Sequence, residues 1–182
     1  GKLNLETERI ESCLLDIENK TRVEKNWVLL PSNGETYIIY QWFPMKIYKL
    51  DNYHKKDQIL NDDLNHENVS LVKTVSTPYY LKDVRGSSNG VEINGEIWFL
   101  CHIVSYEDAR FYYHMFVILD KDTFSVKRCS RMFTFDEKRI EYSLGFVYFE
   151  KENKFLLGYS QHDSDHNYYF VSKDTLDGMM YF

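Results

Sequence analysis

The chain has 182 residues, of which 43% are hydrophobic and 27% charged, and its net charge at pH 7 is −6. This length suits one domain with a packed core. The acidic balance disfavours nucleic acid as the main partner, because a phosphate backbone needs a basic face. No apolar run reaches the ~20 residues that span a bilayer, so we expect no membrane partner. Aromatic residues make up 16% of the chain, an excess that favours sheet over helix.

The cysteines indicate a reducing compartment. The chain has an odd number of cysteines, the three residues Cys13, Cys101 and Cys129, and none lies in a CxxC motif. We therefore expect a cytoplasmic location without disulfides. The sequence carries no nucleophile elbow, phosphate loop, dinucleotide glycine pattern or protease triad, so we expect no cofactor.

Hydrophobic alternation predicts strands along most of the chain. Residues 1–23 begin with a polar stretch and then alternate over 9–17, which we interpret as the outermost strand of an earlier sheet unit. A helix is the alternative there, because Ile10, Leu14 and Leu15 also fit helical spacing. Residues 51–68 are polar and rich in Asp, Asn and Lys, and we expect an exposed loop.

Three successive units then repeat one plan of strands and turns. They span residues 24–80, 84–136 and 139–182. The predicted strands are 24–30, 36–41, 45–50 and 71–75; 84–93, 96–104, 112–119 and 126–135; and 139–149, 155–160 and 168–171. The clusters Pro31-Ser32-Asn33-Gly34 and Asn94-Gly95 are hairpin turn signals.

The repeat length predicts an all-β fold, a β-propeller of four-stranded blades. Glu24, Arg85 and Glu141 begin the first strands and lie roughly 60 residues apart, a period typical of propeller blades. A β-sandwich with accidental spacing is the alternative. Propellers close with about four to eight blades, so three blades predict a portion of a longer protein, or blades supplied by another chain.

The first strands of propeller blades line the central channel, which predicts a polar funnel. Here they contribute Glu24, Arg85 and Glu141, joined by Asn26, Ser87 and Ser88. Carboxylates accept hydrogen bonds from hydroxyls, the planar Arg guanidinium donates several hydrogen bonds, and aromatic faces such as Trp27 and Trp98 stack on sugars. The alternative is that the three charged groups form an ion-paired network that ties the blades together.

A second group of polar residues lies where the second strands end. It comprises Tyr40-Gln41, His102 and Gln161-His162-Asp163. His102 follows an apolar run, so a core histidine is the alternative. Strand alternation places Tyr113 and His114 on opposite faces, so at most one of them joins the site. His162, Asp163, Asp165 and His166 lack a second cluster of fixed spacing, so we expect no metal.

Short motifs at these positions resemble the five-bladed propeller found beside or within glycosyltransferases of bacteria and giant viruses, which is similar in fold to mannoside phosphorylases and arabinanases. The motifs are Glu24-Lys25-Asn26-Trp27, Tyr40 to Pro44, Arg85-Gly86-Ser87-Ser88, His102, Tyr113-His114, Ile140-Glu141-Tyr142 with Gly145, and Tyr159-Ser160 with Asp163. Two departures stand out, His102-Ile103 where relatives often have His-Glu, and His114-Met115 where they often have His-Arg. The resemblance covers about residues 20–175.

The resemblance implies a carbohydrate-active protein with five blades, about two of them outside this chain. Its partners would be a sugar, sugar phosphate or sugar nucleotide, and the remaining blades or a fused transferase domain. The richness in Asn, Lys and Tyr suits an AT-rich viral genome.

Our leading hypothesis is glycosyl transfer, by a glycosyltransferase or a protein like a glycoside phosphorylase. Its catalytic acid and base would be Glu141 and Glu24. The substrate-binding residues would be Arg85, Asn26, Trp27, Ser87, His102, Tyr113 and Asp163. The alternatives are a non-catalytic module that binds glycan and a propeller that docks a protein.

Overall fold

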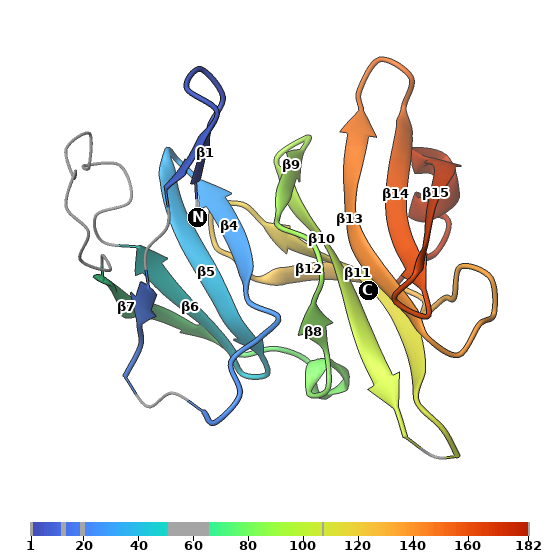
Figure 1. The fold of residues 1–182 in the computed structure, drawn as a ribbon, viewed down its shortest axis with the longest axis horizontal. Coiled ribbons are helices and arrows are strands. Elements are labelled where there is room, and N and C mark those ends of the chain that lie inside the picture. Colours follow the sequence, from blue (N-terminus) through green and yellow to red (C-terminus); the bar gives the residue numbers. More distant parts are fainter. Residues whose placement is uncertain (1, 12–13, 19–20, 51–65, 107, 182) are drawn as a thin grey trace.

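The computed structural model describes residues 2–11, 14–18, 21–50, 66–106 and 108–181. Three antiparallel sheets stand side by side (Figure 1), and we call them blades 1, 2 and 3. Blade 1 contains β4 (Val28–Ser32), β5 (Glu35–Trp42), β6 (Met45–Leu50) and β7 (His66–Val75). Blade 2 contains β8 (Arg85–Gly86), β9 (Val91–Ile93), β10 (Glu96–Ser105), β11 (Phe111–Asp120) and β12 (Val126–Ser130). Blade 3 contains β13 (Glu141–Phe149), β14 (Lys154–Gln161) and β15 (Asp165–Ser172). The predicted all-β, propeller-like fold is confirmed.

The sequence located the hairpins well because their turns need residues that tolerate positive φ. Asn33-Gly34 has φ of 51° and 75°, and Asn94-Gly95 has φ of 52° and 77°. Both pairs adopt the left-handed geometry that matches the twist of the flanking strands. The β4–β5 and β9–β10 hairpins therefore follow from local sequence alone.

Alternation along the central strands builds the core between the blades. On β10, Ile97, Phe99 and Cys101 belong to the cluster shared with blade 1, whereas Trp98 and Leu100 belong to the cluster shared with blade 3. All five side chains are fully buried. Blade 2 is thus apolar on both faces, which explains why β10 reads as a continuous hydrophobic run.

The N-terminal segment differs from its prediction as the outermost strand of an earlier sheet unit. It forms a hairpin of β1 (Lys2–Asn4) and β2 (Arg9–Glu11), followed by β3 (Leu14–Asp16). β3 pairs in parallel with β7, at the outer edge of blade 1. This pairing lets Ile17 join the apolar cluster on that side of blade 1.

Blades 2 and 3 differ from prediction in two further places. β12 ends at Ser130, and residues 131–140 form a loop with a single bridge between Phe133 and His114. Blade 3 has the three predicted strands, but they are followed by the short helix α1 (Lys173–Asp177) and by β16 (Met180–Tyr181), which were not predicted. β16 pairs with β12, so the end of the described chain returns to blade 2. The predicted exposed loop at 51–68 lies largely outside the described residues.

The predicted strand 84–93 is interrupted between β8 and β9, and the interruption joins blades 1 and 2. Its backbone N–H groups at Ser87 and Ser88 both donate to the carbonyl of Leu100, at 3.1 and 3.0 Å. Gly90 N–H then donates to the carbonyl of Leu29 in blade 1 at 2.8 Å, and Asn89 Oδ1 accepts from Leu29 N–H at 3.1 Å. Residues 87–90 therefore leave the regular strand pairing of blade 2, and Asn89 and Gly90 hydrogen-bond to blade 1 instead.

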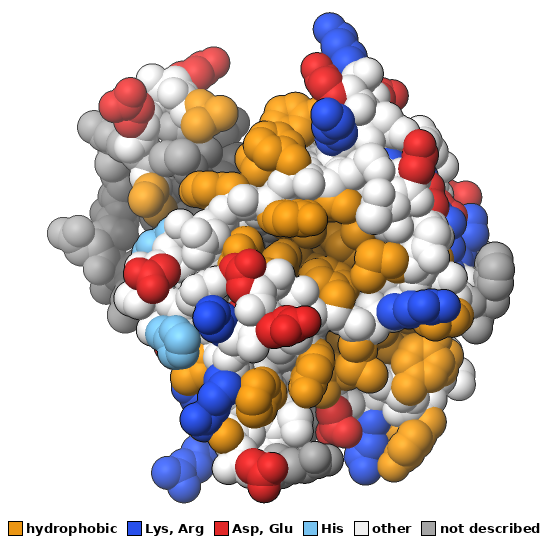
Figure 2. Space-filling model, turned by 90° about the vertical axis from the view of Figure 1, so that its right-hand side faces the viewer, with side chains coloured by type: hydrophobic (Ala, Val, Ile, Leu, Met, Phe, Trp, Pro, Cys, Tyr) orange, Lys and Arg blue, Asp and Glu red, His pale blue; other side chains and the backbone are white. Residues whose placement is uncertain are grey.

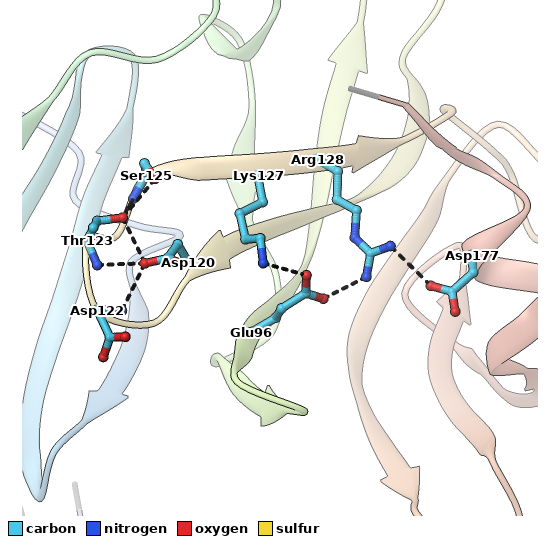
Figure 3. Close-up of polar contacts among 8 residues, drawn as sticks. All are labelled: Glu96, Asp120, Asp122, Thr123, Ser125, Lys127, Arg128 and Asp177. Atoms are coloured by element: carbon cyan, nitrogen blue, oxygen red, sulfur yellow. Dashed lines mark hydrogen bonds and ion pairs between the residues drawn. The ribbon is translucent and has the colours of Figure 1, made fainter.

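Charged side chains hold α1 against the outer part of blade 2 (Figure 3). Arg128 donates to Glu96 at 2.6 Å and lies 3.5 Å from Asp177 of α1, and Lys127 pairs with Glu96 at 3.1 Å. At the preceding turn, Asp120 accepts from Thr123 N–H at 2.8 Å, which closes the β11–β12 connection.

Gly86 is required where the inner chains of blades 1 and 2 meet. A Cβ at this position would lie 2.9 Å from the Asn26 carbonyl and would overlap the Val28 side chain. We expect Gly86→Ala to lower the free energy of unfolding by about 1–3 kcal/mol, the usual range for overpacking a close contact. Urea denaturation measures the change.

Gly178→Ala is the matched control, because Gly178 has helical φ and an added methyl group would lie 3.5 Å from its nearest neighbours. A Gly86→Ala variant as stable as Gly178→Ala would contradict the close approach.

Candidate functional site

A pocket of about 210 Å³ opens where the inner strands of blades 1 and 2 meet. It is lined by Lys25, Asn26, Tyr40, Gln41, Trp42, Val84, Arg85 and Gly86. The lining holds two cations and no carboxylate, although the protein as a whole is acidic. Among the described residues, no carboxylate lies within ion-pair distance of Arg85 or Lys25.

The backbone positions the polar groups of this pocket. Asn26 has φ of 63°, a left-handed conformation that Asn adopts more readily than most residues. Its carbonyl faces Gly86, the residue after Arg85, so the missing Cβ of Gly86 brings Asn26 and Arg85 to one wall. Gln41 is held from within its own blade, since Nε2 donates to the carbonyls of Phe43 and Pro44 at 3.2 and 3.0 Å.

Glu24 lies behind one wall of the pocket and reaches it through Tyr40. The Tyr40 hydroxyl donates to Glu24 Oε1 at 3.0 Å, and Thr21 N–H donates to the same oxygen. Burial acts to raise the pKa of Glu24, but hydrogen bonds from Thr21, Tyr40 and Trp27 outweigh it and lower the pKa. Glu24 is therefore a carboxylate at neutral pH, which suits a base or a hydrogen-bond acceptor rather than a general acid.

His102 lies directly opposite Arg85 in the β8–β10 ladder, on the face turned to blade 3. Its Nδ1 is 2.8 Å from Ser87 Oγ, and its ring contacts those of Tyr112 and Tyr142, with centroids 5.7 and 5.3 Å away. Burial first, and then the charges of Arg85 and Lys25, lower the pKa of His102 to about 4. The imidazole is neutral at pH 7 and adds no charge to the site.

His114 lies opposite His102 on β11 and is fully buried. Neither of its ring nitrogens has a hydrogen-bond partner, and the buried Ser143 Oγ is likewise without one among the described residues. Burial, followed by the neighbouring His102, lowers the pKa of His114 to about 3, and an interaction with the Glu141 backbone offsets only part of this.

The environment of Glu141 differs from the predicted funnel, in which its charge would face the central channel. Its side chain is fully buried, and its carboxylate accepts three backbone N–H bonds, from Phe135 at 2.6 Å, Asp136 at 2.9 Å and Lys138 at 2.7 Å. These bonds fold the 131–140 loop back onto blade 3. Glu141 is therefore engaged by the protein rather than presented beside Arg85, so its predicted role as catalytic acid or base has no geometric support.

The other predicted residues divide into two groups. Asn26 and Arg85 line the pocket, Ser87 contacts His102, and the Trp27 ring packs on Tyr40 at 5.4 Å. Tyr113 is not among the residues that line the pocket; it lies opposite Ile103 on β10, and so points to the other face of blade 2 from His102.

Asp163 is also apart from the pocket, exposed in the β14–β15 turn of blade 3 with φ of 58°. Sequence reasoning missed Lys25 as a second cation of the site. The sequence did offer one signal for Lys25, since it directly follows the predicted site residue Glu24.

Two absences hold for the described part of the chain. No three His, Cys, Asp or Glu side chains gather there as a metal site requires. No helix in the described ranges has the length and hydropathy of a membrane-spanning segment.

Comparisons with known proteins bear on the fold. A scan against protein-family models found no matching family, and a search of curated proteins found no match. Among solved structures, the chain is similar to the crystal structure of a glycosyl hydrolase from Bacteroides ovatus, with a TM-score of 0.53 and 14% sequence identity. The match covers 82% of this chain and 49% of that one, so the chain spans about half the length of its structural neighbour. At this identity the likeness shows a shared fold.

Acid should destabilise the protein through His102 and His114. Both pKa values are lower in the folded state, about 4 and about 3, than the ordinary value of 6.5, so the unfolded chain binds more protons below that pH. The free energy of unfolding should be highest above pH 6.5 and fall as the pH drops towards 4, by up to about 1.4 kcal/mol per pH unit for each imidazole.

Urea denaturation between pH 4 and 8 measures this slope. His114→Gln should reduce it, whereas His166→Gln, at an exposed position on β15, should leave it unchanged. An equal slope in His114→Gln and the unaltered protein would contradict the assignment.

Glu141→Gln tests the anchoring role of that carboxylate. An amide side chain keeps one acceptor oxygen but replaces the other with a donor, so at least one of the backbone N–H groups loses its acceptor. We expect a loss of about 2–3 kcal/mol in the free energy of unfolding, measured by urea denaturation, with the exposed Glu137→Gln as control. Full stability with loss of a sugar-dependent reaction would instead return Glu141 to a catalytic role.

Proposed function

We propose that the pocket between blades 1 and 2 binds a carbohydrate that carries an anionic group, such as a sugar phosphate. The observation that carries the proposal is its lining. Arg85 and Lys25 supply positive charge with no carboxylate among the lining residues, and Asn26 and Tyr40 add neutral hydrogen-bonding groups. A guanidinium binds two oxygens of a phosphate in one plane, and amide and hydroxyl groups pair with sugar hydroxyls.

The shared fold supports a carbohydrate ligand over other anions. The structural neighbour is a glycosyl hydrolase, and the match spans most of this chain. Fold alone does not fix function, so the argument rests on the pocket, and the likeness only favours one class of ligand for it.

Binding without hydrolysis fits this geometry best. Glycoside hydrolysis requires two carboxyl groups about 5–10 Å apart across the scissile bond. Glu24 lies one hydrogen bond behind the pocket wall, and Glu141, the second predicted carboxylate, is used by three backbone N–H groups. The described chain therefore presents one candidate carboxylate, and we propose a glycan-binding part of a carbohydrate-active protein.

Glycosyl transfer to or from phosphate is the second candidate. It is favoured by the placement of an ionised Glu24 close to paired cations that suit a phosphate. In that reaction Arg85 and Lys25 would hold the phosphate and Glu24 would act as base. A fused transferase domain and a sugar-nucleotide donor belong to this candidate.

Isothermal titration of the chain with a hexose 1-phosphate, the neutral hexose and inorganic phosphate tests the proposal. We expect the hexose phosphate to bind most tightly, and Arg85→Gln to weaken its binding at least tenfold, because a charge-assisted hydrogen bond contributes about 1.5–3 kcal/mol. Binding should also weaken as the salt concentration rises.

Arg131→Gln is the matched control, since Arg131 is an exposed arginine whose guanidinium lies over Tyr181 on blade 2, outside the pocket. Equal affinity for the neutral hexose and its phosphate would reject the anionic group. A glycan array and titrations that detect no sugar binding at all would favour a protein-docking propeller instead.

A further inference from the structure

The surfaces of this protein differ in what they can recognise. Blade 3 carries exposed large hydrophobic side chains, among them Leu144, Val147 and Phe170. Figure 2 looks at that side of the molecule and shows hydrophobic side chains across its centre, with charged side chains around them. A small polar ligand needs several convergent hydrogen-bonding groups instead. The pocket between blades 1 and 2 supplies them, and its polar lining residues are Lys25, Asn26, Tyr40, Gln41 and Arg85.

A bulge in β5 places two adjacent polar side chains on one wall of this pocket. Ile39 and Gln41 pair with successive residues of β6, so Tyr40 between them is an extra residue in the strand. Ile39 and Trp42 both belong to the core cluster shared with blade 2. Tyr40 and Gln41 are therefore left together on the other face, and both line the pocket. A regular strand would present only one of them.

The hydroxyl proton of Tyr40 is already used inside the protein. It goes to Glu24 Oε1, 3.0 Å away. Because Glu24 is ionised, its oxygens only accept hydrogen bonds, and a carboxylate is a stronger acceptor than a sugar hydroxyl. Burial, followed by the hydrogen bond to Glu24 and its charge, raises the pKa of Tyr40, so the phenol keeps its proton at neutral pH. Tyr40 Oη therefore offers a ligand only a lone pair.

Both amide protons of Gln41 are used as well. Nε2 donates to the carbonyls of Phe43 and Pro44, at 3.2 and 3.0 Å. The reverse orientation of the amide would set Oε1 against those two carbonyl oxygens, so the backbone fixes the direction of the side chain. The group that remains for a ligand is Gln41 Oε1, which accepts hydrogen bonds and cannot donate them.

The charged donors of the pocket lie apart from this wall. Burial, and after it the charges of Arg85 and Lys25, lowers the pKa of His102 to about 4, so both cations lie close to blade 2. The negative charge of Glu24 behind Tyr40 repels a phosphate from the other side. A phosphorylated ligand is thereby oriented, with its phosphate at the cations and its remaining groups against Tyr40.

We infer that Tyr40 and Gln41 form a wall of hydrogen-bond acceptors that selects free sugar hydroxyls, and that Glu24 is the positioning residue that fixes the direction of the Tyr40 hydrogen bond. This inference rests on the proposed function and deepens it, because it specifies a sugar phosphate with unsubstituted hydroxyls on the side away from the phosphate. A ligand that lacks these hydroxyl protons leaves the acceptors of the wall unpaired, which is the stronger kind of discrimination.

Isothermal titration with a hexose 1-phosphate and its monodeoxyfluoro forms tests the inference. Fluorine is close to a hydroxyl group in size but cannot donate a hydrogen bond. We expect fluorination at a position that meets the wall to weaken binding at least tenfold. Tyr40→Phe keeps the ring and removes the acceptor, so it should reduce this preference to about threefold or less. The matched control is Tyr37→Phe on the same strand, since the Tyr37 ring packs on Phe124 at 5.7 Å and is not part of the lining.

Glu24→Gln tests the positioning role. A glutamine amide can donate to Tyr40 Oη, which frees the phenolic proton for the ligand. The preference for the hydroxyl over the fluorinated form should therefore fall at least threefold, and adding Tyr40→Phe should bring no further fall beyond that of Tyr40→Phe alone. A merely structural role of Glu24 would weaken the binding of both forms equally and leave the preference unchanged. Far-ultraviolet circular dichroism confirms that each variant is folded.

The possible results separate this inference from the proposed function. Absence of hexose phosphate binding, or equal binding by Arg85→Gln, would reject the proposed function and this inference with it. Binding that depends on Arg85 but does not distinguish any fluorinated form would overturn the acceptor wall alone. A preference that survives Tyr40→Phe would overturn the wall as well, and one that survives Glu24→Gln would overturn the positioning role.

Discussion

The close approach of blades 1 and 2 is the contact on which the rest of the structure depends. Two adjacent inner chains come so near that only a glycine fits at position 86, against the Asn26 carbonyl and the Val28 side chain. The following residues then leave their own ladder, and Gly90 and Asn89 hydrogen-bond to Leu29 in the neighbouring blade. These backbone hydrogen bonds form a seam between the inner edges of blades 1 and 2, and this seam sets how the large buried faces of the two blades pack.

The same seam assembles the candidate site. It brings Arg85 of blade 2 beside Asn26 of blade 1, and it places Ser87 against His102. His102 is kept neutral by burial and by the nearby cations, so positive charge at the pocket comes from Arg85 and Lys25 alone. Structural and ligand-binding roles are thus separated within a few residues. His102 and His114 are buried in the interior between blades 2 and 3, whereas Arg85 and Lys25 are among the residues that line the pocket.

Local sequence was sufficient for the elements whose causes are local. Turns such as Asn94-Gly95 and the strand Met45–Leu50 follow from positive-φ residues and period-two alternation, and both are where the sequence predicts them. The interruption at 87–90 did not follow, because its hydrogen bonds go to Leu29, far away in the sequence. The parallel pairing of β3 on β7 and the return of β16 to β12 are long-range for the same reason.

Among the site residues, the sequence by itself determined which groups lie near the starts of the inner strands, including Glu24, Arg85 and Glu141. Only the tertiary structure decided which of them remain available. Glu141 is satisfied by three N–H groups of a loop that packs over it, and Arg85 has no described carboxylate in reach. Sequence spacing specifies the position of a side chain along a strand, but whether its charge meets backbone, solvent or ligand depends on segments that folding brings beside it.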